Sequence, residues 1–434
     1  MSESHQIESP AAPHRRRWSF TRVSINAQPG QQRPRLLRFA LSLLVVAVAL
    51  DLAAADSPGT NKTAGEPLRI PFPETTVHRV EEHPQNKNIL LIARDRVAQD
   101  EGSVSGAGKW CGPRLLMFAY GYTGGYGKVF PFHGGFLFDV VSRKMWKLGK
   151  LHGGEGIGCS PDGEWLTYFK KVNQGKDLVL WRYHIKTGKK EPFLQLDAKV
   201  GYMGMFSPDG KRILYFRKRM GEPIKTGDPQ WKISWLGWEQ GRQATAVWLA
   251  DSTGILVKDL SDPKDNLSKS VMWTARPEAL DQRRPLRVDS ELSQLKVDAA
   301  NRIYGIHYQT FPHIPGTPQK GKRSLMRCEI TTADSFKCEE AIAGNPNITP
   351  SYQVSQDGGV IFFHDHVEAE DQCCIWRYDV NNKQKQRLWE GRAIFSLNLS
   401  LDGKYMAFKS DGLFVPDVHG QTNGFALMRV NNNY

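Results

Sequence analysis

The sequence lacks the short motifs that most often mark a catalytic centre. It contains no G-x-S-x-G nucleophile elbow, no phosphate-binding loop of the Walker type and no H-E-x-x-H zinc motif. C-x-x-C and C-x-x-C-H are also absent, which argues against thioredoxin-like redox chemistry and covalent haem attachment. These absences favour a protein that binds a partner without chemistry of its own.

Long helical and membrane-spanning patterns are absent as well. No long stretch repeats apolar residues at the helical spacing, so we expect strands. The apolar run 39–50 is too short for a comfortable membrane span, follows three arginines and leads into Ala53-Ala54-Ala55. We therefore predict that residues 1–55 are a signal peptide with a long polar start, and that the protein is periplasmic or secreted. The alternative is an uncleaved N-terminal membrane anchor.

Cysteine is scarce, and the six that occur suit an oxidising compartment. Cys328 and Cys338 lie symmetrically about Ala333, so a hairpin turning there places them opposite each other on neighbouring strands. This is the spacing that a disulfide needs, and we predict that they are bonded. The sequence leaves open how the other four cysteines are paired, although structural disulfides are the favoured interpretation. These four are Cys111, Cys159, Cys373 and Cys374.

The sequence does contain one sequence motif, or phrase, that is repeated along the chain. The copies are SPDGEWLTYF from Ser160, SPDGKRILYF from Ser207, SQDGGVIFFH from Ser355 and SLDGKYMAFK from Ser400. Each begins with a box of residues that favours a tight turn and continues into a run that favours a strand. Recurrence of such a unit predicts a repeat architecture.

A second phrase follows each turn box. It occurs as LWRYHI, LMRCEI and IWRYDV, with weaker copies in GFLFDVV, VWLADS and ALMRVNN. These copies reveal degenerate boxes at HPQN from His83 and DAAN from Asp298, which makes six units. The spacing from Ser355 to Ser400 has the length of a four-stranded propeller blade. We predict an all-β propeller of six four-stranded antiparallel blades, with seven blades as the alternative.

The two phrases resemble those of the TolB-like β-propeller repeat family. Blades of that family carry an S-P-D-G box followed by a strand with an [IL]-[WY]-x-[YVM]-[DN] phrase, and the boxes at Ser160 and Ser207 match it strictly. The resemblance covers most of the chain from about Pro67 onward. It implies a propeller, whereas the function of such propellers ranges over binding, scaffolding and catalysis.

The domain boundaries follow from the repeats. We assign residues 56–76 to an N-terminal segment and residues 77–434 to the propeller. The last unit ends without an outer strand, and a closed ring needs that blade completed from the other end of the chain. We therefore expect Leu68 to Phe72 to pair alongside Leu427 to Val430.

Loop lengths indicate which face of the propeller functions. The segments 95–134, 218–245, 309–324 and 366–373 interrupt the repeats between the second and third strands, and we expect them on the face opposite the turn boxes. They are rich in aromatic side chains, which suit sugar stacking and protein recognition. The binding candidates are Trp110, Tyr122, Tyr126, Phe132, His133, Trp231, Trp235, Trp238, Phe311 and His313.

Four histidines provide an alternative interpretation of the same face. His307, His364 and His366 lie near the ends of two predicted strands, and His133 lies in an insertion. Imidazoles that converge can hold a divalent metal. The alternative to binding is therefore a metal-dependent, glycan-active lyase or hydrolase; otherwise no cofactor is expected.

The charge pattern limits the partners. The formal net charge is +13, but the basic residues are dispersed. Outside the cytoplasm a nucleic acid is an improbable partner, and a membrane is expected only through an uncleaved N-terminal segment. We predict a protein or polysaccharide partner in the cell envelope or outside it.

Overall fold

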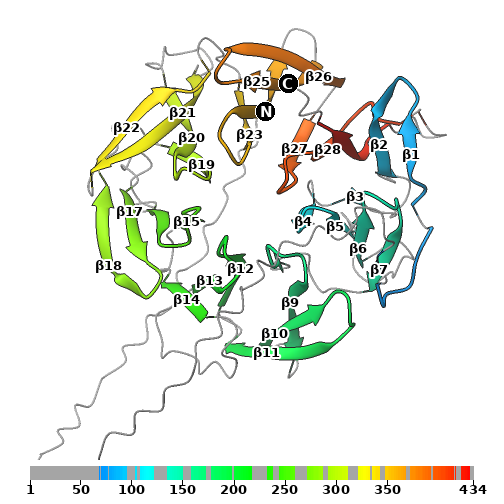
Figure 1. Ribbon diagram of the computed structural model, residues 1–434, viewed down its shortest axis with the longest axis horizontal. Coiled ribbons are helices and arrows are strands. Elements are labelled where there is room, and N and C mark those ends of the chain that lie inside the picture. The colour runs from blue at the N-terminus through cyan, green and yellow to red at the C-terminus, as the bar shows by residue number, and fades with distance from the viewer. Residues whose placement is uncertain are drawn as a thin grey trace, which may run out of the picture. The chain divides into compact units, whose positions relative to one another are not determined.

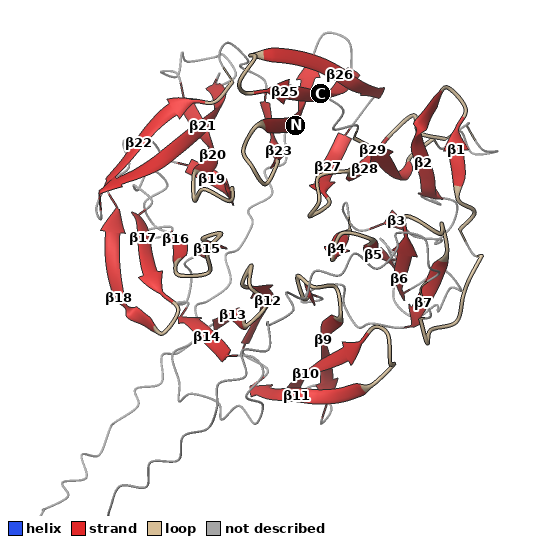
Figure 2. Cartoon of the chain, viewed as in Figure 1, coloured by secondary structure: helices blue, strands red, loops and turns tan. Residues whose placement is uncertain are grey.

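The structure is a computed structural model in which the chain divides into two compact units, Met1–Lys62 and Thr63–Tyr434. The described residues are 68, 70–76, 78–94, 103–104, 108–121, 134–149, 158–172, 177–197, 200–217, 232–237, 244–259, 271–286, 292–310, 321–332, 335–342, 348–367, 372–391, 394–414, 416 and 422–430. These residues form strands joined by turns, without a helix (Figure 2). No helix that could span a membrane is found among them. The predicted signal peptide, residues 1–55, lies outside these ranges.

The described strands of the second unit form seven sheets around a central axis (Figure 1). We number these sheets blades 1 to 7, in the order of their innermost strands along the chain. Neighbouring strands are antiparallel, except that the outermost strand of blade 3 is parallel to its neighbour. The expected all-β propeller of four-stranded antiparallel blades is confirmed, and the number of sheets is the seven given as the alternative.

The strands of each blade follow one another outward from the axis. Blade 1 contains β4 (Lys109–Cys111) and β3 (Ser103–Val104) on the inner side of β5 (Leu115–Gly121), then β6 (Gly134–Asp139) and β7 (Met145–Gly149). Blade 2 contains β8 (Gly158–Cys159), β9 (Trp165–Val172), β10 (Asp177–His184) and β11 (Lys190–Asp197). Blade 3 contains β12 (Val200–Phe206), β13 (Arg212–Arg217) and β14 (Lys232–Gly237). Blade 4 contains β15 (Ala244–Trp248), β16 (Ile255–Asp259), β17 (Val271–Arg276) and β18 (Ala279–Leu286).

The remaining blades complete the ring. Blade 5 contains β19 (Leu292–Val297), β20 (Ile303–Thr310), β21 (Gly321–Thr332) and β22 (Ser335–Glu340). Blade 6 contains β23 (Ile348–Val354), β24 (Val360–Val367), β25 (Gln372–Asp379) and β26 (Gln384–Gly391). Blade 7 contains β27 (Ile394–Leu399), β28 (Tyr405–Ser410) and β29 (Gly424–Arg429), followed by β2 (Asn86–Arg94) and β1 (Glu81–His83) from the other end of the chain.

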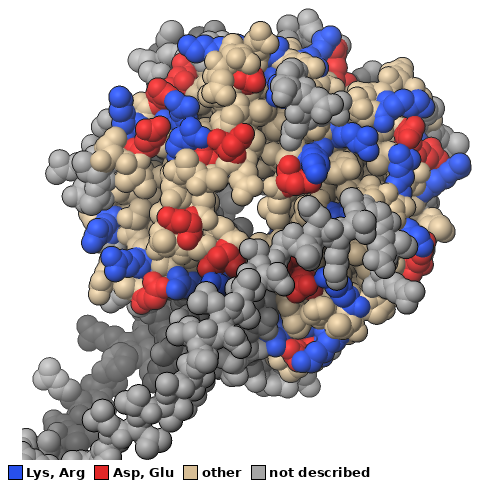
Figure 3. All heavy atoms as spheres, in the orientation of Figure 1, with Lys and Arg blue, Asp and Glu red and all other residues tan. Residues whose placement is uncertain are grey.

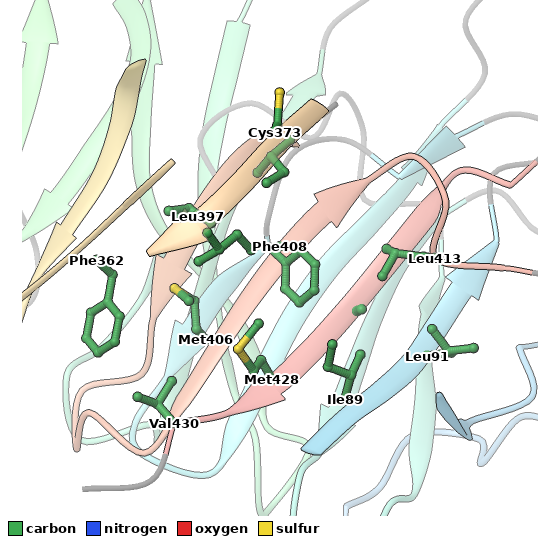
Figure 4. Packing of buried hydrophobic residues seen from close by; sticks show 13 residues of the cluster. Ile89, Leu91, Phe362, Cys373, Leu397, Met406, Phe408, Leu413, Met428 and Val430 are labelled. Carbon is green, nitrogen blue, oxygen red and sulfur yellow. The ribbon is translucent and has the colours of Figure 1, made fainter. Parts of the chain in front are cut away.

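Strand β2 closes the ring. It pairs antiparallel with β29, so that Ile89 lies opposite Met428. Ile89 and Leu91 are buried in the core between blades 6 and 7, in the same cluster as Phe408 (Figure 4). The expectation that an N-terminal strand completes the last blade is confirmed.

The predicted closing segment is nevertheless the wrong one. Leu68, Ile70 and Phe72 pack against the core between blades 1 and 2, and the Phe72 ring stacks on Tyr183 with 4.3 Å between ring centroids. The segment contains Pro71 and further prolines, which have no amide hydrogen to donate to a regular ladder. It therefore covers a blade junction, and β2 provides the closing strand.

The sequence units were divided differently from the blades. HPQN and GFLFDVV were assigned to one unit, yet they lie at β2 in blade 7 and at β6 in blade 1. Similarly, VWLADS was assigned as a third strand, but it consists of the end of β15, the innermost strand of blade 4, and the turn that follows. The turn after β15 has Ser252 in the left-handed place, at φ 61, where the regular boxes have glycine. This substitution concealed a seventh box.

The box from Ser355 to Gly358 shows how the repeat forms its turn. The Gly358 amide donates to the Ser355 carbonyl at 2.8 Å, and the Val360 amide donates to the Ser355 hydroxyl at 2.8 Å. That hydroxyl donates in turn to the Asp357 carboxylate at 2.6 Å. Gly358 has φ 72, a left-handed conformation that other residues rarely adopt, and a Cβ there would meet side-chain atoms of Arg302 and Asp298, so the position favours glycine. The same bonds recur in the boxes at Ser160, Ser207 and Ser400.

Hydrogen bonds also join successive blades near the axis. They run from the Asp209 amide to Ser252 Oγ at 3.0 Å, from the Ala250 amide to Asn301 Oδ1 at 2.7 Å, from Arg302 to the Asp357 carbonyl at 2.7 Å, and from the Trp110 indole to the Asn398 carbonyl at 3.0 Å. The blades are therefore connected through both these polar contacts and the apolar clusters between their sheets.

Two disulfides fasten the propeller. Cys328 and Cys338 are directly opposite on β21 and β22, with their Cα atoms 4.0 Å apart, which confirms the predicted pair. Cys111 and Cys159, which the sequence left unassigned, join the innermost strands β4 and β8 of neighbouring blades, with Cα atoms 5.0 Å apart. Cys373 and Cys374 are buried outside any disulfide, so the favoured interpretation of structural disulfides is wrong for these two.

Candidate binding face

The connections between the second and third strands define the candidate binding face. In an antiparallel blade these connections leave the sheet at the end opposite the turn between the first and second strands. They are the segments 122–133, 173–176, 260–270, 311–320, 368–371 and 411–423 in blades 1, 2, 4, 5, 6 and 7. We call this end of the propeller the insertion face, and the opposite end the turn-box face.

Most aromatic candidates belong to segments outside the described residues. Tyr122, Tyr126, Phe132 and His133 fall in the connection between β5 and β6, and Phe311 and His313 fall in that between β20 and β21. Trp231 and Trp238 flank β14 and are also outside them. Their proposed role in binding stays a prediction.

Blade 3 differs from the expectation of one long loop. Residues 218–245 contain the strand β14, in which Trp235 pairs with Tyr215. Because β14 is parallel to β13, it begins at the turn-box face, where Lys232 pairs with Arg212. The segment 218–231 therefore joins the two faces, and Trp235 lies within a strand and not in a loop.

Trp110 is the one indole among the candidates whose surroundings are described, and it is buried. It lies on the innermost strand β4, and its Nε1–H donates to the Asn398 carbonyl across the junction of blades 7 and 1. The assignment of Trp110 to an insertion is wrong, because residues 95–134 contain β3, β4 and β5. Its indole supports ring closure and is not available to a partner.

Tyr308 provides an exposed aromatic ring that the sequence analysis did not single out. It lies near the end of β20 at the insertion face, where 47% of the residue is exposed. Arg323 lies opposite it on β21, with the guanidinium carbon 5.7 Å from the centre of the ring. The ring and the exposed guanidinium together form a platform of the kind that stacks on planar or ring-shaped ligand groups. Tyr308 shares its side of β20 with the buried Tyr304 and Ile306, so the pattern of the strand does not reveal its exposure.

The histidines proposed as metal ligands do not face one another. In β20, His307 shares the face of Ile303, which packs toward blade 4. In β24, His364 shares the face of Phe362, which packs toward blade 7, and is itself buried. These two imidazoles therefore point to different blade junctions.

The rest of the proposed metal set cannot be placed. His133 and the side chain of His366 lie outside the described part of the chain. Within that part, no group of three or more His, Cys, Asp or Glu side chains gathers as a metal site.

The one thiol near a charged group is also poorly suited to nucleophilic chemistry. Cys374 is buried opposite Asp365, and burial together with that carboxylate raises the pKa of its thiol. Asp365 accepts a hydrogen bond from the Trp376 indole at 2.6 Å and lies 3.3 Å from the Lys385 ammonium. This arrangement stabilises blade 6 and leaves the thiol protonated.

The fold can be compared with solved structures. An oligogalacturonate lyase in complex with manganese is 13% identical, has a TM-score of 0.52, and is matched over 83% of this chain and 97% of its own. An oligogalacturonate lyase from Vibrio parahaemolyticus is 12% identical, has a TM-score of 0.51, and is matched over 85% of this chain and 99% of its own. At these identities the likeness shows the propeller fold alone.

The TolB-like assignment rests on the repeats. TolB from Acinetobacter baumannii is 10% identical over 69% of this chain and 60% of its own, with a TM-score of 0.37, which is too low to support an argument. No protein-family model matches the sequence, and no curated protein matches it. The TolB-like family therefore stays a prediction.

Proposed function

We propose that this protein is an exported β-propeller that binds a protein or glycan partner through its insertion face and performs no chemistry of its own. The observation that carries the proposal is the platform of Tyr308 and Arg323. A half-exposed tyrosine with a guanidinium against its ring is typical of recognition surfaces, because it provides broad apolar area with little loss of conformational entropy on binding.

Export is supported by the cysteines. The disulfides Cys111–Cys159 and Cys328–Cys338 form and persist in oxidising compartments such as the periplasm. The Arg-flanked apolar run that ends in Ala53-Ala54-Ala55 supports the same location.

The second candidate is a metal-dependent, glycan-active enzyme on the same face. It is favoured by the likeness in fold to two oligogalacturonate lyases over nearly their whole length. It is disfavoured by the opposite orientations of His307 and His364. An enzyme of this class would require His366 and further groups on the insertion face to supply the metal ligands.

A crosslinking and glycan-binding experiment tests the proposal. A photoreactive phenylalanine at position 308 should crosslink to a partner in the cell envelope, or the purified protein should bind members of an oligosaccharide array. Tyr308→Ala should weaken that binding by about tenfold or more, the range expected for loss of an aromatic anchor.

Leu401→Ala is the matched control. Leu401 is 50% exposed in a turn box, on the opposite face, and its loss should leave binding unchanged. Equal weakening by both variants would contradict the proposal. So would metal-dependent cleavage of oligogalacturonate by the purified protein, which would establish the second candidate instead.

A further inference from the structure

The innermost strands have an unusual charge composition. The seven strands nearest the axis are β4, β8, β12, β15, β19, β23 and β27. They contain no Asp, Glu or Arg, and their only charged residues are Lys109 on β4 and Lys296 on β19. The innermost strands therefore contribute two lysines and no acidic residue to the surroundings of the central channel.

Lys296 lies among apolar and aromatic groups. It is opposite Tyr304 on β20 and shares the face of β19 that packs toward blade 6, where Tyr304 and Tyr352 are fully buried. Burial lowers the pKa of the Lys296 ammonium below its usual range. Among the described residues, its ammonium makes no hydrogen bond or ion pair.

The carboxylate nearest to Lys296 along the chain is already engaged. Asp298 accepts hydrogen bonds from Arg302 Nε at 2.6 Å and from the Tyr304 hydroxyl at 3.1 Å. A desolvated cation without a partner is costly, and an anion that enters the channel would remove that cost. Lys296 is half-buried, so its surroundings leave part of it open to solvent.

The turn-box face carries charged groups around the opening of the channel. The boxes that follow the innermost strands carry exposed carboxylates in Asp162, Asp209 and Asp357, each held by amides of its own turn. Figure 3 shows an opening at the centre of the ring with acidic atoms around it. Lys296 lies two residues before the box that begins at Asp298. The same boxes also carry Lys211 and Arg302, so the charge at this mouth is mixed, and the attraction for an anion comes from Lys296.

We propose that the central channel holds a small anionic ligand through a carboxylate or phosphate group that contacts Lys296. The carboxylate of an acidic sugar and a phosphate group are two sources of the same anionic oxygens. This site is separate from the platform of Tyr308 and Arg323, and it does not depend on the proposed function.

Calorimetric titration at constant ionic strength tests the site, with galacturonate, inorganic phosphate and neutral galactose as probes. We expect saturable binding of galacturonate or phosphate, and none of galactose. The probe that binds identifies the source of the anion. Lys296→Met should weaken binding by at least about tenfold, while Lys296→Arg retains more of it.

Two variants serve as controls for charge and for the other site. Lys211→Met removes an exposed lysine of a turn box, and Tyr308→Ala removes the platform, so both should bind the anion as the original protein does. Failure of both anions to bind the original protein would overturn the proposal. Equal binding by the Lys296→Met variant would also overturn it.

A labelling experiment covers the case in which the Lys296→Met variant does not fold. The original protein is acetylated with acetic anhydride, and the rate at Lys296 is followed by peptide mass spectrometry. The bound anion should slow acetylation of Lys296 by several-fold and leave that of Lys211 unchanged. Equal rates with and without the anion would contradict the site.

Discussion

Asp139 is a fully buried carboxylate at the end of β6. Burial by itself raises its pKa, but hydrogen bonds from Arg114 at 2.6 Å, from the Ser142 hydroxyl at 2.6 Å and from the Val141 amide at 3.1 Å bring the pKa below its usual range. The ionised group therefore contributes stability above the unfolded-state pKa of about 3.9, and this contribution is lost as the pH falls through the lower folded-state pKa.

Replacement of this carboxylate should be costly. We expect Asp139→Asn to lower the free energy of unfolding at neutral pH by about 3 kcal/mol, because Arg114 is left without its partner. The part of the acid denaturation that Asp139 causes should disappear. Urea denaturation at a series of pH values measures both effects. Glu164→Gln, which disrupts the exposed pair with Lys186, is the control and should change stability by less than about 1 kcal/mol.

Single residues also show where sequence reasoning succeeds and where it stops. The roles of Ser355 and Asp357 follow from the turn chemistry of their types and were predicted. The left-handed conformation of Ser252 depends on contacts with neighbouring blades, because its hydroxyl accepts the Asp209 amide. Tyr308 is exposed although Tyr304 and Ile306 on the same side of β20 are buried, and no local pattern distinguishes them.

At the scale of elements, the hairpin of β21 and β22 was predicted from sequence symmetry alone. Cys328 and Cys338 are paired in register, and the bond closes a short loop at the outer edge of blade 5. Replacing both by serine should destabilise the protein by about 2–3 kcal/mol on the chain-entropy estimate, without changing the fold.

Thermal unfolding of the double variant, followed by circular dichroism, measures this effect. Peptide mapping of protein recovered from an oxidising compartment gives an independent check. Free thiols at both positions would contradict the pairing.

The innermost strands were the elements least accessible to prediction. β4 has three residues and β8 has two, too few to display the alternation by which a strand is identified. The end of β15 was visible in VWLADS, but its altered box suggested a third strand. The predicted insertions 309–324 and 366–373 each span the connection between two consecutive strands, β20 to β21 and β24 to β25. The predicted insertions 95–134 and 218–245 instead contain the missed strands β3, β4, β5 and β14.

At the scale of the whole unit, the ring depends on β1 and β2. Strand β2 contributes Ile89 and Leu91 to the core between blades 6 and 7, and Ile92 to that between blades 7 and 1. His83 on β1 packs edge-on against Trp389 of blade 6, with 5.0 Å between ring centroids. The hairpin thus contacts three blades through side chains, although its backbone bonds reach only β29.

These contacts predict that the hairpin of β1 and β2 stays bound in the ring even when the chain between β2 and blade 1 is cut. A specific protease site introduced within residues 95–102 separates β2 from the rest of the chain. After cleavage under native conditions, we expect the N-terminal fragment to stay bound through size-exclusion chromatography and to be released only in denaturant, because it fills two interblade cores and completes a sheet whose edge would otherwise be open. The cleaved protein should also unfold in a single transition.

Ile89→Asp in the same cleavable protein provides the decisive comparison. A carboxylate at this fully buried position has no partner within the cluster that surrounds Ile89, so its desolvation should release the fragment on cleavage and lower stability by several kcal/mol before cleavage. Leu68→Asp replaces a partly buried side chain of the segment first expected to close the ring, and it should leave the fragment bound. Release of the unmodified fragment on cleavage would contradict the prediction that β2 holds it. Its release by Leu68→Asp alone would show that the segment before β1 holds the fragment in place and not β2.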